Sequence, residues 1–214
     1  MPLSKSFIFS ILITLAVIGC SRNQDATPFE FCAHNLKFKY DSNTHLLSVA
    51  DTITLNFNRN VDHIYFFLHD SLQVTRICIG NQELIPEPVS PRYIQTLPLL
   101  TEKMAKVLDR AQIVQVPIPK SLFPKSIKVW YSGNVDSRDL PEIAWHPILP
   151  GVHANFQLAA LLPAEFKPAE NNILSLQNCE DAWCLWTGQT SEPKQFCDIP
   201  FLISEATNPK TILN

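Results

Sequence analysis

Glycine is scarce in this 214-residue sequence, and long runs of like charge are absent. The five glycines, at positions 19, 80, 133, 151 and 188, form no phosphate-binding loop, and there is no Gly-x-Ser-x-Gly elbow of a serine hydrolase. No run of five or more basic residues occurs, which argues against a nucleic-acid partner. One long apolar run lies near the N-terminus and no second one follows, so we expect the rest of the protein to be soluble.

The N-terminus has the layout of a signal peptide. One positive charge, Lys5, precedes an apolar run at 7–18, which is short of the ~20 residues that span a bilayer. The run ends in Val17-Ile18-Gly19-Cys20, which resembles the lipobox of bacterial lipoproteins. A plain signal peptide that contains a cysteine and an uncleaved anchor are the alternatives, and the run is short for the second.

The lipobox resemblance implies cleavage before Cys20 and diacylglycerol on its thiol. Two or three acyl chains give stable anchoring. Ser21, in place of Asp, favours the outer membrane by resemblance to enterobacterial sorting, with the protein facing the periplasm. We therefore expect a signal peptide at 1–19, a lipidated tether at 20–30, a β-domain at 31–206 and a tail at 207–214. Removing 19 of 214 residues leaves 195, with 16 basic and 20 acidic side chains.

Five cysteines besides Cys20 make disulfides the default in an exported chain, with at least one thiol left over or paired between chains. Cys179 and Cys184 flank four residues that fit a hairpin loop, and opposed strand positions bring Cβ atoms within ~5.5 Å. A Cys184–Cys197 bridge is the alternative, and we expect at least one bridge among these three. Cys179-x4-Cys184 fits a zinc site loosely, but no second pair follows. The disulfide candidates are Cys32, Cys78, Cys179, Cys184 and Cys197.

A catalytic cysteine would need a lowered pKa and a partner histidine. No cysteine has such a histidine within hydrogen-bond range along the chain, and contact through space stays open. We expect no metal and no cofactor.

Short segments of period-two alternation dominate the remaining sequence. The longest covers 47–57, where Val49, Ile53, Leu55 and Phe57 would share one face. The proline-rich segment from 85 departs from this pattern, and Thr101 can cap one short helix near 100–111. The pattern predicts a mainly β fold, an antiparallel β-sandwich. The other predicted strands lie at 36–40, 63–68, 72–79, 113–119, 126–132, 154–162, 173–176, 182–187 and 196–204.

Three stretches follow one another along the chain: 35–41 with 47–55, then 114–119 leading to 127–133, and then Trp145-His146-Pro147 followed by 154–158 and 162–163. In this order they resemble the N-terminal domain of the M1 family, the gluzincin aminopeptidases. The resemblance implies a saddle of antiparallel β-sheet that precedes a catalytic domain.

Chemistry in that family needs His-Glu-x-x-His, in which two histidines hold zinc and the glutamate acts as general base. None of the six histidines is followed by another at this spacing, and no Gly-Ala-Met-Glu-Asn occurs. No catalytic residue is carried over, so we expect a non-enzyme: a lipid-anchored module that binds a protein or peptide. The alternative is the accessory half of a split M1-like metallopeptidase with its zinc-binding domain on another chain. A degenerate remnant is a third interpretation.

Two weaker patterns complete the candidates. His63, His69 and Asp70 could suggest a metal or a base, but we favour strand-end and loop positions for them. Trp145, Trp183 and Trp186 suggest a platform for a sugar or peptide, and core or sheet-edge packing is the alternative.

Overall fold

A computed structural model describes residues 29–57, 61–87, 89, 110–119, 125–137, 139–140, 143–149, 152–168, 173–194 and 203–205. Within these residues the chain is built of strands and has no α-helix. The strands are β1 Phe29–Asp41, β2 Leu46–Phe57, β3 His63–His69, β4 Leu72–Ile79, β5 Gln82–Leu84, β6 Ala111–Pro117, β7 Ser126–Asn134, β8 Ala154–Pro163, β9 Phe166–Pro168, β10 Leu174–Glu180, β11 Trp183–Gln189 and β12 Ile203–Glu205.

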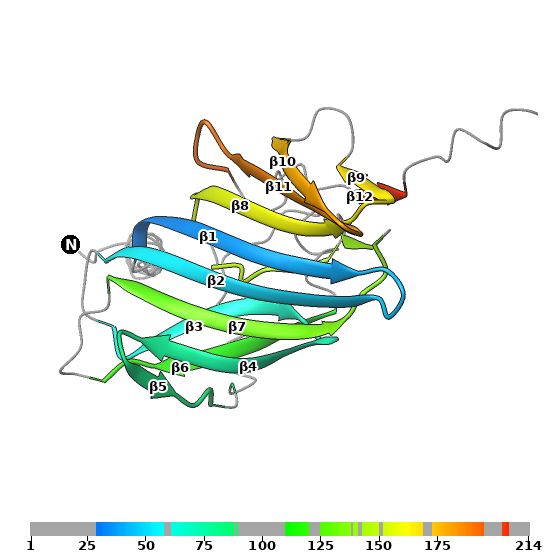
Figure 1. The fold of residues 1–214 in the computed structure, drawn as a ribbon. Coiled ribbons are helices and arrows are strands. Elements are labelled where there is room, and N and C mark those ends of the chain that lie inside the picture. Colours follow the sequence, from blue (N-terminus) through cyan, green and yellow to red (C-terminus); the bar gives the residue numbers. More distant parts are fainter. Residues whose placement is uncertain are drawn as a thin grey trace, which may run out of the picture.

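Eight strands form one large, curved, open sheet in the order β10-β11-β8-β1-β2-β7-β4-β5 (Figure 1). The mainly β fold is therefore confirmed. The sheet is not wholly antiparallel, because β1 and β8 run in parallel, with Cys32 opposite Ala154 and Lys39 opposite Leu161. A parallel pair needs a crossover rather than a hairpin, and here the connection spans more than a hundred residues.

Strands β3 and β6 pair with each other and pack against the inner face of the large sheet. Alternate residues of β3, namely Ile64, Phe66 and Leu68, join a core built mainly from the large sheet. On the opposite side of β3, Phe67 packs with Ile148 of the loop at 143–149. β3 is thus buried on both sides, as its unbroken apolar run predicts. A third sheet pairs β9 with β12.

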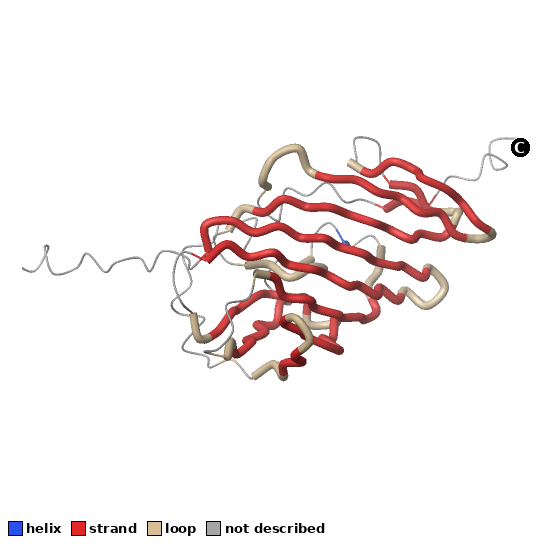
Figure 2. Tube along the Cα trace, turned by 60° about the vertical axis from the view of Figure 1, so that its left-hand side comes forward, coloured by secondary structure: helices blue, strands red, loops and turns tan. Residues whose placement is uncertain are grey.

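The central hairpin β1–β2 follows the predicted alternation. Its register runs from Phe29 opposite Phe57 to Asp41 opposite Leu46. The turn is closed by Asp41, whose side chain accepts a hydrogen bond from the Asn43 backbone N–H at 3.0 Å. Successive side chains along both strands are alternately buried and solvent-facing, which gives the sheet one apolar face and one polar face. Figure 2 shows the long strands of this sheet running side by side.

Some expectations fall at the margin of the described residues. The helix expected near 100–111 lies outside them except at its end, where Arg110 is a turn residue and Ala111 already begins β6. The strand expected at 196–204 is described only from Ile203, in β12. Residues 1–28, with Cys20, also lie outside. No helix of the described part is long and apolar enough to cross a bilayer.

Candidate functional site

The outer face of the large sheet carries a groove across its centre. Alternation turns Lys37 and Lys39 of β1 outward, while Phe38 between them is buried. On β2 the outward residues at this level are small, Ser48 and Ala50. Because small side chains lie between taller ones, the surface is hollowed along β2.

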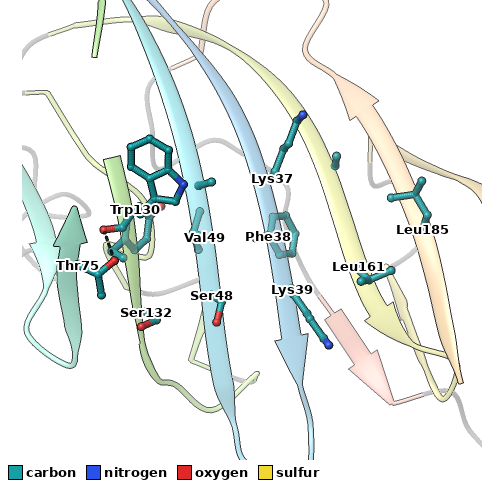
Figure 3. A pocket seen from close by; sticks show the side chains of 13 residues that line it. Lys37, Phe38, Lys39, Ser48, Val49, Thr75, Trp130, Ser132, Leu161 and Leu185 are labelled. Atoms are coloured by element: carbon teal, nitrogen blue, oxygen red, sulfur yellow. Dashed lines mark hydrogen bonds between the residues drawn. The ribbon is translucent and has the colours of Figure 1, made fainter. Parts of the chain in front are cut away.

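Strand register sets the walls of the groove. Ala50 lies opposite Lys37 on one side and opposite Trp130 of β7 on the other. Lys37 and Trp130 are therefore two strand spacings apart, roughly 10 Å. Figure 3 shows the Trp130 ring on one side of the hollow and the two lysines on the other. The hollow has a volume of about 570 Å³, and the outward side chains that line it are Lys37, Lys39, Ser48, Ala50, Thr75, Trp130, Ser132, Ala159, Leu161 and Leu185.

Cations contact the aromatic rings at both ends of this groove. The Arg76 guanidinium lies 5.3 Å from the centre of the Trp130 ring, and Glu83 accepts a hydrogen bond from its Nε at 3.1 Å. The Lys39 ammonium lies 4.0 Å from the centre of the Trp183 ring. These contacts hold the long cationic side chains over apolar surface while their charges stay exposed.

A second, more polar hollow of about 470 Å³ continues the groove on the same face and shares Lys37 and Ala159 with it. Within it the Asn35 amide donates a hydrogen bond to the Gln157 side-chain oxygen at 3.1 Å. Its other outward residues are Ser175, Thr187 and Gln189. Together the two hollows offer an apolar end, two lysines, and an end of amides and hydroxyls. No carboxylate lines either one.

The inner face holds an ion pair inside the core. The His34 Nδ1–H donates to Asp51 Oδ2 at 2.6 Å, and both side chains are almost fully buried. Burial lowers the pKa of His34, but the charge and hydrogen bond of Asp51, with smaller contributions from Cys32, outweigh it and raise that pKa from 6.5 to about 10. His34 is therefore an imidazolium at neutral pH, paired with a carboxylate.

Aromatic and polar groups surround this pair on every side. Phe156 of β8 stacks on the His34 ring with centroids 5.0 Å apart, and the His146 ring lies edge-on at 5.6 Å. Burial, followed by the charge of His34, lowers the pKa of His146 to about 3, so that ring is neutral. Burial and the Asp51 charge raise the pKa of Tyr131 well above its ordinary value. Asp51 Oδ1 and the Tyr131 hydroxyl have no hydrogen-bond partner among the described residues.

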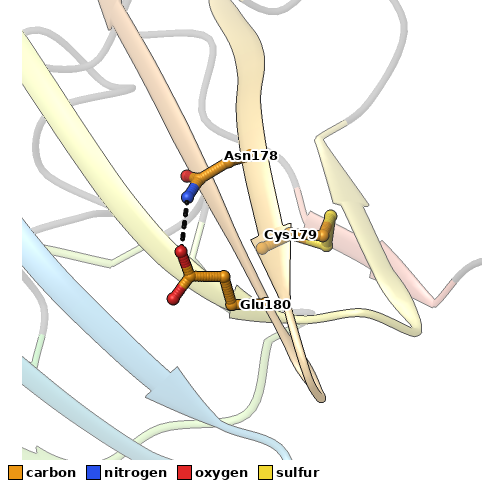
Figure 4. Close-up of a disulfide and its surroundings, with 4 residues drawn as sticks. Asn178, Cys179 and Glu180 are labelled. Carbon is orange, nitrogen blue, oxygen red and sulfur yellow. Dashed lines mark hydrogen bonds between the residues drawn. A yellow bond between two sulfur atoms is a disulfide. The ribbon is translucent and has the colours of Figure 1, made fainter.

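The cysteines confirm one bridge. Cys179 and Cys184 form a disulfide between directly opposed residues of β10 and β11, with Cα atoms 4.1 Å apart (Figure 4). The expected four-residue loop is wrong: Glu180 pairs with Trp183, so the turn has only Asp181, at φ 52°, and Ala182.

Cys32 and Cys78 are buried thiols. Cys32 lies two residues before His34, on the same face of β1, so the sequence argument that no cysteine has a histidine beside it was wrong at this position. Cys32 is 1% exposed and lines neither outer hollow. Cys20 and Cys197 lie outside the described residues.

His63 and His69 do not converge, because they lie at opposite ends of β3. The His69 Nδ1 is 2.7 Å from the Ser71 hydroxyl, and Asp70 accepts a hydrogen bond from Arg110 at 3.3 Å. No group of three side chains able to hold a metal occurs among the described residues.

The predicted tryptophan platform is not formed. Trp145 is buried in the core, and Trp186 packs against the core from β11. Trp183 alone of the three contacts Lys39 on the outer face. The tryptophan that walls the groove is Trp130, whose place in an alternating strand, between outward Lys128 and Ser132, was the available signal.

Comparison with solved structures shows the same fold in M1 zinc metallopeptidases. A mutant of the Deinococcus radiodurans enzyme bound to a Tyr-Ser-Ala substrate matches 78% of this chain, with a TM-score of 0.55 and 14% identity. The enzyme without that mutation matches 79%, with a TM-score of 0.52 and 14% identity. A two-domain M1 enzyme bound to L-tryptophan matches 80%, with a TM-score of 0.55 and 15% identity. The matches cover 41%, 40% and 42% of those chains, so this chain spans about two fifths of their length. No family model and no curated protein sequence matches it.

Proposed function

We propose that this chain is a cell-envelope lipoprotein whose M1-like β-domain is non-catalytic and binds a protein or peptide. The observation that carries the binding role is the groove on the outer face, where exposed lysines and a partly exposed tryptophan wall a floor of small residues that no described segment covers. Hollows with an apolar base and a few convergent polar groups are the usual form of a recognition site.

The non-catalytic part of the proposal rests on side-chain chemistry. The sequence has no His-Glu-x-x-His, and the groove side chains include no histidine, cysteine or carboxylate that would act as a base or nucleophile. The His34–Asp51 pair has such groups, but it is enclosed in the core. Lysines, tryptophan and small residues are suited to recognition.

Site-specific photocrosslinking in cells tests the binding role. A photoreactive amino acid at Ser48, inside the groove, should give adducts with a partner. The same residue at Thr54, which is exposed on the same face of β2 but outside the groove, should give few. Equal labelling at both positions, or none at Ser48, would contradict the proposal. Turnover of aminoacyl amides that a chelator abolishes would contradict its non-catalytic part.

The anchor is proposed from Val17-Ile18-Gly19-Cys20. Cells fed labelled palmitate should label the parent chain, and Cys20→Ala should remove the label and release the protein from membranes. Fractionation of the parent on a density gradient should place it in the outer membrane. Label that persists in the Cys20→Ala chain would refute the assignment.

A second candidate is the accessory half of a split M1-like metallopeptidase. It is favoured by the solved M1 chains, which match here over only about two fifths of their length. Under this proposal the Ser48 adduct contains a chain with His-Glu-x-x-His, and the complex cleaves aminoacyl amides. An adduct with any other class of protein favours the first candidate.

A further inference from the structure

We propose that the groove recognises an extended acidic segment of a protein or peptide, with carboxylates at Lys37 and Lys39 and an apolar side chain on Ala50 against Trp130. This inference rests on the proposed function and names its ligand class. The ligand would carry acidic and apolar residues in alternation, because successive side chains of an extended chain point to opposite sides and the lysines and Trp130 form opposite walls of the groove.

The charge of the two hollows favours an anionic ligand. The chain as a whole is acidic, with 20 acidic and 17 basic side chains, yet no Asp or Glu lines either hollow and two lysines do. Lys37 and Lys39 are exposed and form no salt bridge with any described residue. Both lysines point outward from β1, and their ammonium ends point away from each other in Figure 3, so each meets a separate carboxylate of the ligand.

The shape of the groove favours an extended chain. The floor formed by Ser48, Ala50 and Ser132 is bounded by Trp130 on one side and by the lysines on the other. The strands that carry the two walls are roughly 10 Å apart, two strand spacings, so a single extended chain that lies over β2 fits between them. A flat bilayer surface cannot enter such a hollow, and two lysines are few for a polyphosphate backbone.

The polar hollow suits the backbone of a bound peptide. It continues the groove beyond Lys37 and presents the Asn35 and Gln157 amides together with the Ser175 and Thr187 hydroxyls. Amides and hydroxyls both donate and accept, so they suit the peptide groups of a bound backbone rather than a further charge. The part of the groove between the lysines and Trp130 thus contacts the side chains of the ligand, and the polar hollow binds its backbone.

The test uses the full-length chain on an array of random decapeptides. The bound set should be enriched in Asp and Glu that alternate with apolar residues. Lys37→Gln/Lys39→Gln should weaken binding to this set about tenfold, or about 1.4 kcal/mol, because two exposed ion pairs are lost together. Trp130→Ala should weaken it by a similar factor. Lys128→Gln is the matched control, since Lys128 is exposed on the same face but does not line the groove.

Binding of the acidic set should also fall with added salt. A bound set without acidic enrichment that is still lost in Trp130→Ala would overturn this inference and leave the proposed function standing. Retention of no decapeptide at all would overturn this inference, whereas the proposed function is decided by the adduct at Ser48. Phosphatidylglycerol vesicles and an oligo(dT) strand are assayed in parallel, and binding of either of these without acidic peptides would overturn the inference in favour of an anionic lipid or a nucleic acid.

Discussion

Replacing either member of the buried His34–Asp51 pair should lower the free energy of unfolding, and the two losses should change in opposite directions as the pH falls. In the parent both groups are charged and lie 2.6 Å apart in the core. His34→Gln leaves a carboxylate with no cation, whereas Asp51→Asn leaves an imidazole with no anion. Breaking a buried pair from one side typically costs about 3–5 kcal/mol, and the residue left behind escapes part of this cost by changing its protonation.

The expected losses in the free energy of unfolding follow from the cost of changing the protonation of the residue that remains. An unpaired carboxyl with an ordinary pKa of about 3.9 takes up a proton at pH 7 for about 4 kcal/mol, and for about 1.5 kcal/mol at pH 5. An imidazole with an ordinary pKa of 6.5 is already mostly neutral at pH 7, and holding it neutral at pH 5 costs about 2 kcal/mol. Between pH 7 and 5 the deficit of His34→Gln should therefore shrink by about 2 kcal/mol, while that of Asp51→Asn should grow by about as much.

Urea unfolding followed by tryptophan fluorescence measures this, since Trp145 is buried beside His146. Each variant is compared with the parent at the same pH. His34→Gln/Asp51→Asn is the control, because it has neither charge and should lose the pH dependence of both single variants. Equal losses that do not change with pH would show that the pair is not ionised in the folded protein.

Three further predictions concern other parts of the molecule. His146 has a pKa lowered to about 3, so the unfolded chain binds a proton that the folded chain does not; between pH 6.5 and 5 the free energy of unfolding of the parent, measured in urea, should fall by about 1.5 kcal/mol relative to that of His146→Asn. Cys179→Ala/Cys184→Ala removes a bridge across a short loop and should lower the free energy of unfolding by about 2 kcal/mol, with reductant affecting only the parent. Gly133→Ala places a Cβ 2.0 Å from a backbone oxygen and should cost several kcal/mol in thermal melts, while Gly80→Ala, in open space at φ +56°, should cost about 1 kcal/mol.

The strands were predictable because alternation is a local property. β2 and β4 begin and end within a residue of the segments that the pattern indicates. Which strands pair with one another depends on segments far apart in the sequence, so local alternation does not predict it. β1 pairs in parallel with β8, more than a hundred residues away, and no feature of either segment encodes that choice. The resemblance to a known domain, and not the pattern, pointed to the overall arrangement.

The His34–Asp51 ion pair was not predicted from the sequence, although the strand pattern indicated which face each residue would occupy. Asp51 has the same parity as Val49 and Ile53, so the predicted strand already placed it on the buried face. His34 likewise shares a face with Leu36. What the sequence does not contain is the register that brings the two together. The groove was missed for the same reason, because it exists only where Ala50 lies between Lys37 and Trp130.

The two faces of the β1–β2 hairpin are connected by this register. A slip of one residue would turn Lys37 into the core, and the apolar pattern alone forbids it. A slip of two residues keeps every side chain on its own face, so the apolar pattern does not oppose it. A slip of two residues in the direction that sets His34 opposite Leu55 would move His34 and Asp51 apart and leave two unpaired charges in the core, at a cost of several kcal/mol. The buried pair thus disfavours one of the registers that the apolar pattern leaves open, and the observed register is the one that places Ala50 opposite Lys37 and forms the groove.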